Sequence, residues 1–197
     1  LLPWLITLLF SLNMFSHELT SNASVHIGEG RCSGSYMIHN NKTFVLTSEH
    51  CVLIPEIRML ITDVNGNSTM GNIIYRDPVL DIALISVMLP NVRPIVYRRA
   101  AQQDVTQEVT YTGHTLTLSN LTFTGKIVGH TSDGRYYIVD GFVWFGLSGA
   151  VIYNDAGHTV GVVSALTIGD SPMGRHLLNN LMKASDLSSF DIGTHIR

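Results

Sequence analysis

Charged side chains are scarce in this sequence. Only 14% of its 197 residues are Asp, Glu, Lys or Arg, and the formal net charge is −3. A protein that binds nucleic acid needs a basic patch or a basic run to neutralise phosphates, and this sequence has no basic excess. We therefore expect no nucleic acid among its partners.

Motifs for metals and phosphates are missing as well. Nine histidines are present, but apart from His50 they are scattered singly. None has the His-Glu-x-x-His or Cys-x-x-Cys spacing that holds zinc, and no glycine-rich loop of the P-loop or dinucleotide type occurs. The sequence predicts no metal site and no cofactor, and surface positions for the other histidines.

Cysteine is rare. The sequence has two cysteines, Cys32 and Cys51, which are too few for a protein built on a disulfide framework. Each adjoins an apolar run, so two neighbouring strands could bring them together, and a bridge would then tether the segment that holds His50. The alternative is a pair of buried free thiols in a reducing compartment.

The longest apolar run lies at the N-terminus. Residues 1–15 are nearly all apolar, and as a helix they would span about 22 Å, short of the ~30 Å hydrocarbon core of a bilayer. This length favours the core of a secretory signal peptide, with Ser21-Asn22-Ala23 as its cleavage site. A membrane anchor and a hydrophobic arm packed on the fold are the alternatives. In each case we expect residues 1–23 to lie outside the folded domain.

From Val25 onward the sequence has the pattern of short β-strands. Runs rich in Val, Ile, Thr and Tyr are separated by turn signals such as Asn65-Gly66 and Asp133-Gly134. Strands are expected over residues 34–39, 43–47, 57–63, 70–76, 82–87, 108–112, 121–129, 135–140, 149–153, 159–166 and 179–184. This many short strands predict an all-β sandwich or barrels.

Two other segments organise the chain. Residues 90–104 contain two prolines and an arginine pair, which is typical of a bridge between two halves. Near the C-terminus, Ser185-Asp186 could cap a short helix over residues 187–192, whose apolar side chains would pack back on the strands.

Three residues far apart in the chain are candidates for catalytic chemistry. His50 follows an apolar run, Asp81 stands among apolar residues, and Ser148 lies in Gly146-Leu-Ser-Gly. Each alone has an ordinary explanation: a satisfied histidine, a hydrogen-bonded carboxylate, or a serine in a turn. Their combined order, each in a strand or loop context, favours a catalytic set.

The segments around these residues resemble the trypsin-like (chymotrypsin-fold) serine proteases over about residues 25–192. The matching stretches are Cys32-Ser-Gly-Ser-Tyr-Met-Ile, Phe44-Val-Leu-Thr-Ser-Glu-His50-Cys51, Asp81-Ile-Ala-Leu-Ile, Gly146-Leu-Ser-Gly-Ala-Val-Ile and Gly161-Val-Val-Ser-Ala. The resemblance implies two six-stranded antiparallel β-barrels, over residues 24–92 and 108–197 with a linker over 93–107. It also implies a Cys32–Cys51 disulfide.

The resemblance further implies a role for each catalytic residue. Ser148 would be the nucleophile, His50 its general base, and Asp81 the group that orients the imidazole. The backbone N–H groups of Gly146 and Ser148 would form the oxyanion hole. The implied activity is a serine endopeptidase that acts on polypeptide substrates through an acyl-enzyme.

The specificity pocket is expected between two segments. Its walls would come from Phe142-Val143-Trp144-Phe145 and from Ser164-Ala165-Leu166. No acid stands where trypsins select Lys or Arg, and Leu166 should narrow the pocket, so we expect cleavage after small or medium apolar residues. The histidine of Glu- or Gln-selective viral relatives is replaced by Val163. The alternative is that the aromatic residues are barrel core.

Some positions depart from the family pattern. Leu147 stands where digestive trypsins carry the aspartate that pairs with a freshly cut N-terminus, so we predict no such activation switch. The compact spacing of the three residues resembles HtrA-type or viral enzymes. The expected location is secreted or membrane-anchored, in an oxidising compartment, with residues 1–15 as the possible membrane contact. A viral, membrane-tethered protease and a catalytically inactive binding module are the alternatives.

Overall fold

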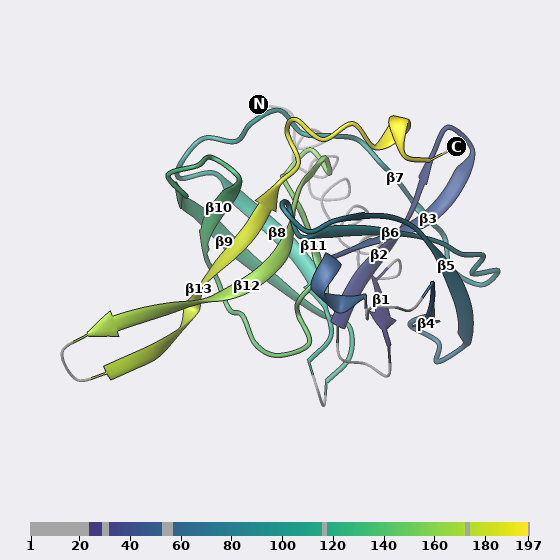
Figure 1. The fold of residues 1–197 in the computed structure, drawn as a ribbon, viewed down its shortest axis with the longest axis horizontal. Helices are drawn as coiled ribbons and strands as arrows, with labels where there is room; N and C mark the ends of the chain where they lie inside the picture. Colours follow the sequence, from purple (N-terminus) through teal and green to yellow (C-terminus); the bar gives the residue numbers. More distant parts are fainter. Residues whose placement is uncertain (1–23, 29–31, 53–56, 116–117, 172–173, 197) are drawn as a thin grey trace, which may run out of the picture.

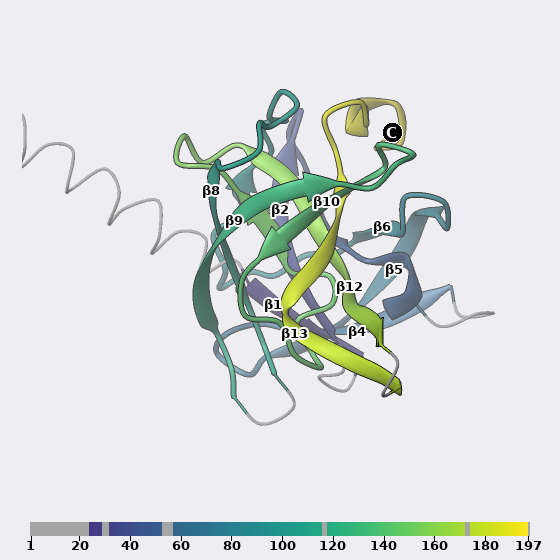
Figure 2. The ribbon, with the colours of Figure 1, turned by 90° about the vertical axis from the view of Figure 1, so that its left-hand side faces the viewer.

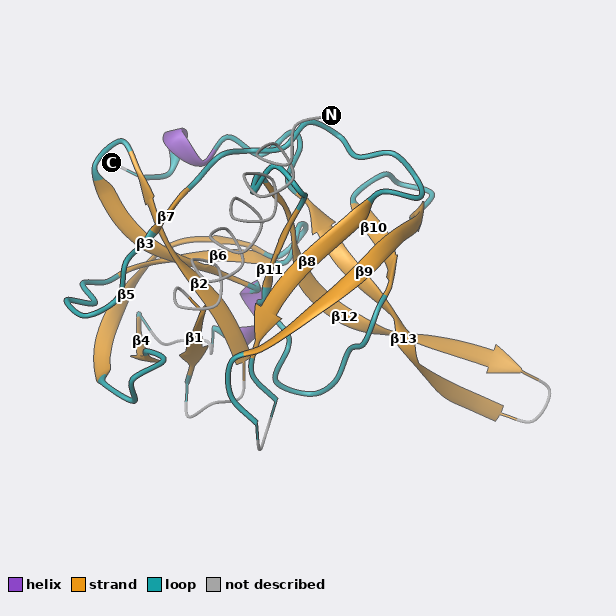
Figure 3. Cartoon of the chain, turned by 180° about the vertical axis from the view of Figure 1, so that it is seen from behind, coloured by secondary structure: helices purple, strands orange, loops and turns teal. Residues whose placement is uncertain are grey.

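The computed structural model describes residues 24–28, 32–52, 57–115, 118–171 and 174–196. The predicted signal or anchor segment, residues 1–23, lies outside this part of the chain. Within the described ranges, no helix is both long and apolar enough to cross a membrane. Strands dominate the described part of the chain, and the two short helices found there are single 3-10 turns (Figure 3).

The first half of the chain forms a closed antiparallel barrel. Its strands are β1 (Ser24–Ile27), β2 (Cys32–His39), β3 (Lys42–Thr47), β4 (Arg58–Thr62), β5 (Ser68–Asp77) and β6 (Ile82–Ser86). They run in the order β1-β4-β5-β6-β3-β2, and pairing of β1 with β2 closes the ring. A short strand, β7 (Ile95–Val96), lies within the predicted linker and adds to β2 in parallel.

The second half forms another closed antiparallel barrel beside the first (Figure 1). Its strands are β8 (Glu108–Gly113), β9 (Leu121–His130), β10 (Tyr136–Asp140), β11 (Val151–Tyr153), β12 (Thr159–Ser171) and β13 (Gly174–Asp186). The order around the barrel is β10-β13-β12-β11-β8-β9. The predicted all-β, chymotrypsin-like class with two six-stranded barrels is therefore confirmed.

Strand β3 shows how the two barrels are joined. Its residues Phe44, Val45 and Leu46 are all fully buried, because both faces of the strand are covered. Side chains alternate along a strand, so Val45 packs in the core of the first barrel while Phe44 and Leu46 face a cluster shared with Val151 of the second. This shared apolar layer fixes the barrels against each other and therefore fixes the residues between them.

The hairpin of β12 and β13 is longer than expected. Pairing continues from Gly161 and Asp186 out to Ser171 and Gly174, beyond the predicted strand ends at 166 and 179. The outer part of the hairpin projects from the second barrel in Figure 1 and points toward the viewer in Figure 2. Mutual backbone pairing maintains the two strands there without the support of the barrel core.

The C-terminal helix is a single 3-10 turn at Ile192–Thr194 rather than a helix over residues 187–192. The backbone N–H of Leu187 donates to the carbonyl of Val160 on β12, and the Asp186 carboxylate accepts from the N–H of Ser188. These bonds hold the chain in a turn. The apolar side chains of this segment are nevertheless buried against the barrels, as expected.

Candidate active site

The disulfide implied by the resemblance is confirmed. The sulfurs of Cys32 and Cys51 are bonded, which joins the start of β2 to the 3-10 turn η1 (Glu49–Cys51). His50 is the middle residue of that turn, so the disulfide tethers its backbone. The two sulfurs and His50 form a cluster of potential metal ligands, but bonded sulfurs are not thiolates and do not fit a metal.

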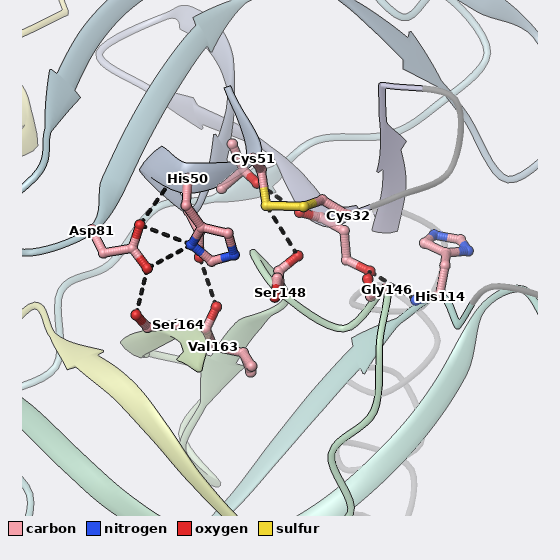
Figure 4. Close-up of a disulfide and its surroundings, with 12 residues drawn as sticks. Cys32, His50, Cys51, Asp81, His114, Gly146, Ser148, Val163 and Ser164 are labelled. Atoms are coloured by element: carbon pink, nitrogen blue, oxygen red, sulfur yellow. Dashed lines mark hydrogen bonds and ion pairs between the residues drawn. A yellow bond between two sulfur atoms is a disulfide. The ribbon is translucent and has the colours of Figure 1, made fainter. Parts of the chain in front are cut away.

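His50 and Asp81 are joined by three hydrogen bonds (Figure 4). Nδ1 of His50 lies 2.8 Å from Oδ2 and 3.0 Å from Oδ1 of Asp81, and the backbone N–H of His50 donates to Oδ1 at 2.9 Å. Asp81 directly precedes β6 and has a positive φ of 54°, a conformation that aspartate tolerates better than most residues. One carboxylate therefore holds both the backbone and the ring of the histidine.

Ser164 on β12 completes the surroundings of the carboxylate. Its hydroxyl donates a hydrogen bond to Oδ2 of Asp81, so this serine, expected in the substrate pocket, contacts the aspartate. The neighbouring carbonyl of Val163 accepts a 2.7 Å hydrogen bond from the hydroxyl of Ser48, which precedes the His50 turn. Both barrels thus contribute to the position of the His50–Asp81 pair.

The pair shifts the acidity of both its members. The hydrogen bond and the charge of Asp81 raise the pKa of His50 above its usual value, against the opposing effect of burial. Burial would raise the pKa of Asp81, but hydrogen bonds from His50 and Ser164 outweigh it and lower that pKa. An ionised Asp81 accepts the Nδ1 proton of His50, which leaves Nε2 as the basic nitrogen, on the side where Ser148 lies (Figure 4).

Ser148 lies in a tight loop between β10 and β11. Gly146 and Gly149 have φ values of 100° and 86°, which favour glycine. A Cβ at Gly149 would overlap the carbonyl oxygen of Ser33, and one at Gly146 would lie 2.6 Å from the carbonyl oxygen of His114. The glycines in Gly146-Leu-Ser-Gly therefore let the loop pack closely against its neighbours.

Two backbone amides of this loop are available, whereas those of Leu147 and Gly149 are bonded to the carbonyls of Trp144 and Val163. Within the described part of the chain, the N–H groups of Gly146 and Ser148 donate no hydrogen bond. No hydrogen bond joins the Ser148 hydroxyl to His50 in the same ranges, but the two residues line one pocket. Nucleophile and base candidates thus share a cavity with two unpaired amide donors.

The pocket has a volume of about 450 Å³ and is mainly apolar. Its lining residues are Cys32, His50, Val143, Trp144, Phe145, Gly146, Ser148, Val163, Ala165 and Leu166. Of the five residues expected to bind substrate, Val143, Ala165 and Leu166 are in this lining. Phe142 is not, and stacks on Phe123 with ring centroids 4.9 Å apart.

The aromatic residues before the serine differ in their surroundings. Trp144 and Phe145 are 41% and 54% exposed, so they form a wall of the pocket rather than barrel core. Val143, between them and Phe142, is buried in the core of the second barrel. Each of the two expected roles, pocket wall and barrel core, therefore holds for part of this segment.

His114 corrects the expectation that all the scattered histidines lie at the surface. Its side chain is fully buried, and its ring centroid lies 3.5 Å from that of His26. Nδ1 of His114 accepts from the N–H of Asn120, and Nε2 lies 3.0 Å from the hydroxyl of Ser24. Burial lowers the pKa of His114 to about 3, so the ring is neutral and forms part of the contact between β1 and β8.

Two paired barrels, with a serine, a histidine and an aspartate gathered where they meet, define the chymotrypsin-like class of protease fold. A family model for the trypsin-like peptidase domain matches residues 32–162, well over half of the chain. The chain therefore belongs to the trypsin-like peptidase domain family. The matched range contains all three of these residues.

A solved structure shows the same fold. The crystal structure of the serine endoprotease from Yersinia pestis superposes with a TM-score of 0.73 and 18% sequence identity, over 94% of this chain and 66% of that one. At this identity the likeness concerns the fold alone. The chain thus spans about two thirds of the length of that endoprotease. No curated protein matches the sequence.

Proposed function

We propose that this protein is a serine endopeptidase that hydrolyses peptide bonds with Ser148 as nucleophile, His50 as general base and Asp81 as orienting group. The observation that carries the proposal is the hydrogen-bonded His50–Asp81 pair, whose histidine lines the same pocket as Ser148. Family membership supports the same reaction class.

The proposed reaction has two halves. Ser148 Oγ attacks the carbonyl carbon of the peptide bond while Nε2 of His50 takes the hydroxyl proton. The tetrahedral intermediate collapses, the C–N bond breaks, and His50 returns the proton to the leaving amine. Water then adds to the acyl-enzyme with His50 again as base, which releases the carboxylic acid and restores the serine. The ionised Asp81 stabilises the imidazolium in both halves.

The oxyanion of each tetrahedral intermediate needs two converging donors. The N–H groups of Gly146 and Ser148, which have no partner in the described chain, fit this role. One such donor typically contributes about 3 kcal/mol of transition-state stabilisation.

The pocket supports cleavage after small or medium apolar residues. Its side walls are apolar. Leu166 narrows the pocket for large substrate side chains, and Val163 offers no polar group to a polar one. No carboxylate is among its lining residues, so a substrate Lys or Arg would find no partner there. Trp144 and Phe145, which are partly exposed, would contact the substrate near the pocket mouth.

The disulfide supports an oxidising compartment as the site of action. Exposure to a reducing cytosol would remove the bond that tethers the His50 turn. Secretion or membrane anchoring through residues 1–23 completes this proposal, and such an anchor would keep the peptidase near a membrane surface.

Turnover of internally quenched peptides tests the proposal. The wild type should cleave peptides with Ala or Val before the scissile bond, and Ser148→Ala should reduce kcat/KM by about 10⁴-fold or more. Ser132→Ala, an exposed serine in the turn between β9 and β10, serves as the control and should match the wild type. Equal turnover by wild type and Ser148→Ala would leave the inactive binding module as the better description.

A further inference from the structure

Ser33, the second residue of β2, is a buried polar residue whose hydrogen bonds cross from one barrel to the other. Its hydroxyl donates to the carbonyl of Gly146 at 2.7 Å and accepts from the backbone N–H of His114 at 2.8 Å. Its own N–H donates to the carbonyl of Ser148 at 2.7 Å, and its carbonyl accepts from the hydroxyl of Thr47. Every polar group of this fully buried residue is therefore paired.

Three of these four bonds go to the second barrel, and two of them go to the loop that contains Ser148. The carbonyls of Gly146 and Ser148 both point to Ser33, so they bracket the peptide unit that carries the Ser148 N–H. As a glycine, Gly146 has a wide choice of backbone conformations. A hydrogen bond that fixes its carbonyl removes much of this conformational freedom. The Ser148 amide proposed for the oxyanion hole thus lies between two carbonyls that are bonded to a residue of the other barrel.

The residue between the two anchored carbonyls cannot supply an ionic anchor. Leu147 is uncharged and fully buried, so the loop has no carboxylate at this position to pair with an amino terminus. Its side chain and the Ser33 hydroxyl fill the space beside Gly113, where a Cβ would lie 2.9 Å from Leu147 Cδ2 and 2.8 Å from Ser33 Oγ. A neutral hydrogen bond and apolar packing hold the loop together.

We infer that Ser33 is a positioning residue that keeps the loop of residues 146–149 in its oxyanion-binding form without an ion pair to a cleaved N-terminus. This inference rests on the proposed peptidase function. The two bonds of the Ser33 hydroxyl, to the Gly146 carbonyl and the His114 N–H, need no charged amino terminus. The oxyanion hole would therefore not depend on a cleavage that creates one.

The test is Ser33→Ala in the full chain. The variant keeps both backbone bonds of residue 33 but leaves the Gly146 carbonyl and the His114 N–H without their partner. We expect kcat to fall about 10- to 100-fold, less than the loss of a whole oxyanion-hole donor, with KM nearly unchanged. The affinity for a peptide boronic acid, whose tetrahedral adduct occupies the oxyanion hole, should fall by a similar factor.

Ser35→Ala is the matched control. Ser35 is a buried serine on the same strand, and in the described chain it makes no hydrogen bond to residues 146–149. A merely structural effect of losing a buried hydroxyl would appear as lower thermal stability in both variants, with kcat and boronate affinity unchanged. Ser33→Thr, which keeps a hydroxyl, should recover part of the lost kcat.

A second variant disturbs the hydrogen bond between the Ser33 hydroxyl and the Gly146 carbonyl without changing Ser33. Gly113→Ala places a methyl group against the Ser33 hydroxyl and Leu147, and should lower kcat and boronate affinity together. Gly129→Ala, where a Cβ meets open space, should change neither. If the wild type is active but Ser33→Ala and Gly113→Ala match their controls in kcat and boronate affinity, the inference about Ser33 is overturned. The proposed function is then unaffected. A wild type with no turnover would overturn the proposed function, and this inference with it.

Discussion

Nδ1 of His50 lies 2.8 Å from Oδ2 of Asp81, and the backbone N–H of His50 lies 2.9 Å from Oδ1 of the same carboxylate. A single side chain therefore fixes the histidine at two points, and the Asp81 carboxylate is itself fixed by the Ser164 hydroxyl. The carboxylate is only 15% exposed, whereas the imidazole is 44% exposed. The ring is thus held from its inner side and open to a substrate on its outer side.

Asp81→Asn should lower kcat by about 10³- to 10⁴-fold, because an amide can present its N–H to Nδ1 and so favour the wrong tautomer of His50. Turnover of a quenched peptide measures the effect, and thermal unfolding checks that the fold is retained. Asp133→Asn, which removes an exposed carboxylate from the turn between β9 and β10, should keep wild-type activity. A loss below 10-fold in Asp81→Asn would show that Asp81 does not set the tautomer.

The activity should depend on pH through His50. The base must be neutral, and its pKa is raised above the ordinary value of 6.5 by Asp81. Activity is therefore present above this pKa and is lost as the pH falls through it, so the acid limb of kcat/KM should have its midpoint above 6.5. In Asp81→Asn the residual activity should show a lower midpoint. An acid limb below 6.5 in the wild type would contradict the assignment of His50 as the base.

Leu166→Gly should widen the proposed specificity pocket. Because Leu166 is part of the pocket lining, its removal should raise kcat/KM for substrates with Phe before the scissile bond and lower it for those with Ala. The ratio of the two should change about 10-fold or more. Leu166→Met, which keeps the volume, should preserve the wild-type ranking. The same ranking in all three proteins would mean that the substrate side chain binds elsewhere.

The buried His114 should make the fold sensitive to acid. Its pKa is about 3 in the folded state against 6.5 when unfolded, so between these values the unfolded chain binds the proton and stability falls as pH falls. The cost at pH 5 is about 2 kcal/mol, which corresponds to roughly 4–8 °C in Tm for a chain of this size. Thermal unfolding at pH 7.5 and pH 5 measures it.

His114→Gln should reduce this acid-induced drop in Tm, because the amide does not titrate. His158→Gln, a histidine in the turn between β11 and β12, should show the same drop as the wild type. If His114→Gln and the wild type lose equal stability between the two pH values, another group is responsible for the acid sensitivity.

Much of the fold was accessible from the sequence, because strand patterns depend on local alternation and turn residues. The expected strands at 43–47 and 82–87 match β3 and β6 closely, and turn signals such as Asn65-Gly66 separate the observed strands. Strands β1 and β7 were not predicted. They are only four and two residues long, too short for a periodic pattern, and they exist because β2 provides a partner.

The site residues, like the strands, were only partly predictable from the sequence. Sequence order and neighbouring residues were enough to single out His50, Asp81 and Ser148 as candidates. The contacts of Ser33 and Ser164 depend on which chain segments meet across the two barrels, and nothing adjacent in sequence encodes that. A serine amid the apolar residues of a strand is a signal of such a contact, since a buried hydroxyl needs a partner, but it does not identify the partner.

Covalent labelling by a fluorophosphonate probe tests the central claim most directly, because the probe reacts with a serine hydroxyl only where a base and an oxyanion hole activate it. Mass spectrometry of the digested adduct should locate the label on Ser148 in the wild type, with no label in Ser148→Ala and much slower labelling in Asp81→Asn. Equal labelling of the wild type and Ser148→Ala, or a label on another serine, would contradict the account.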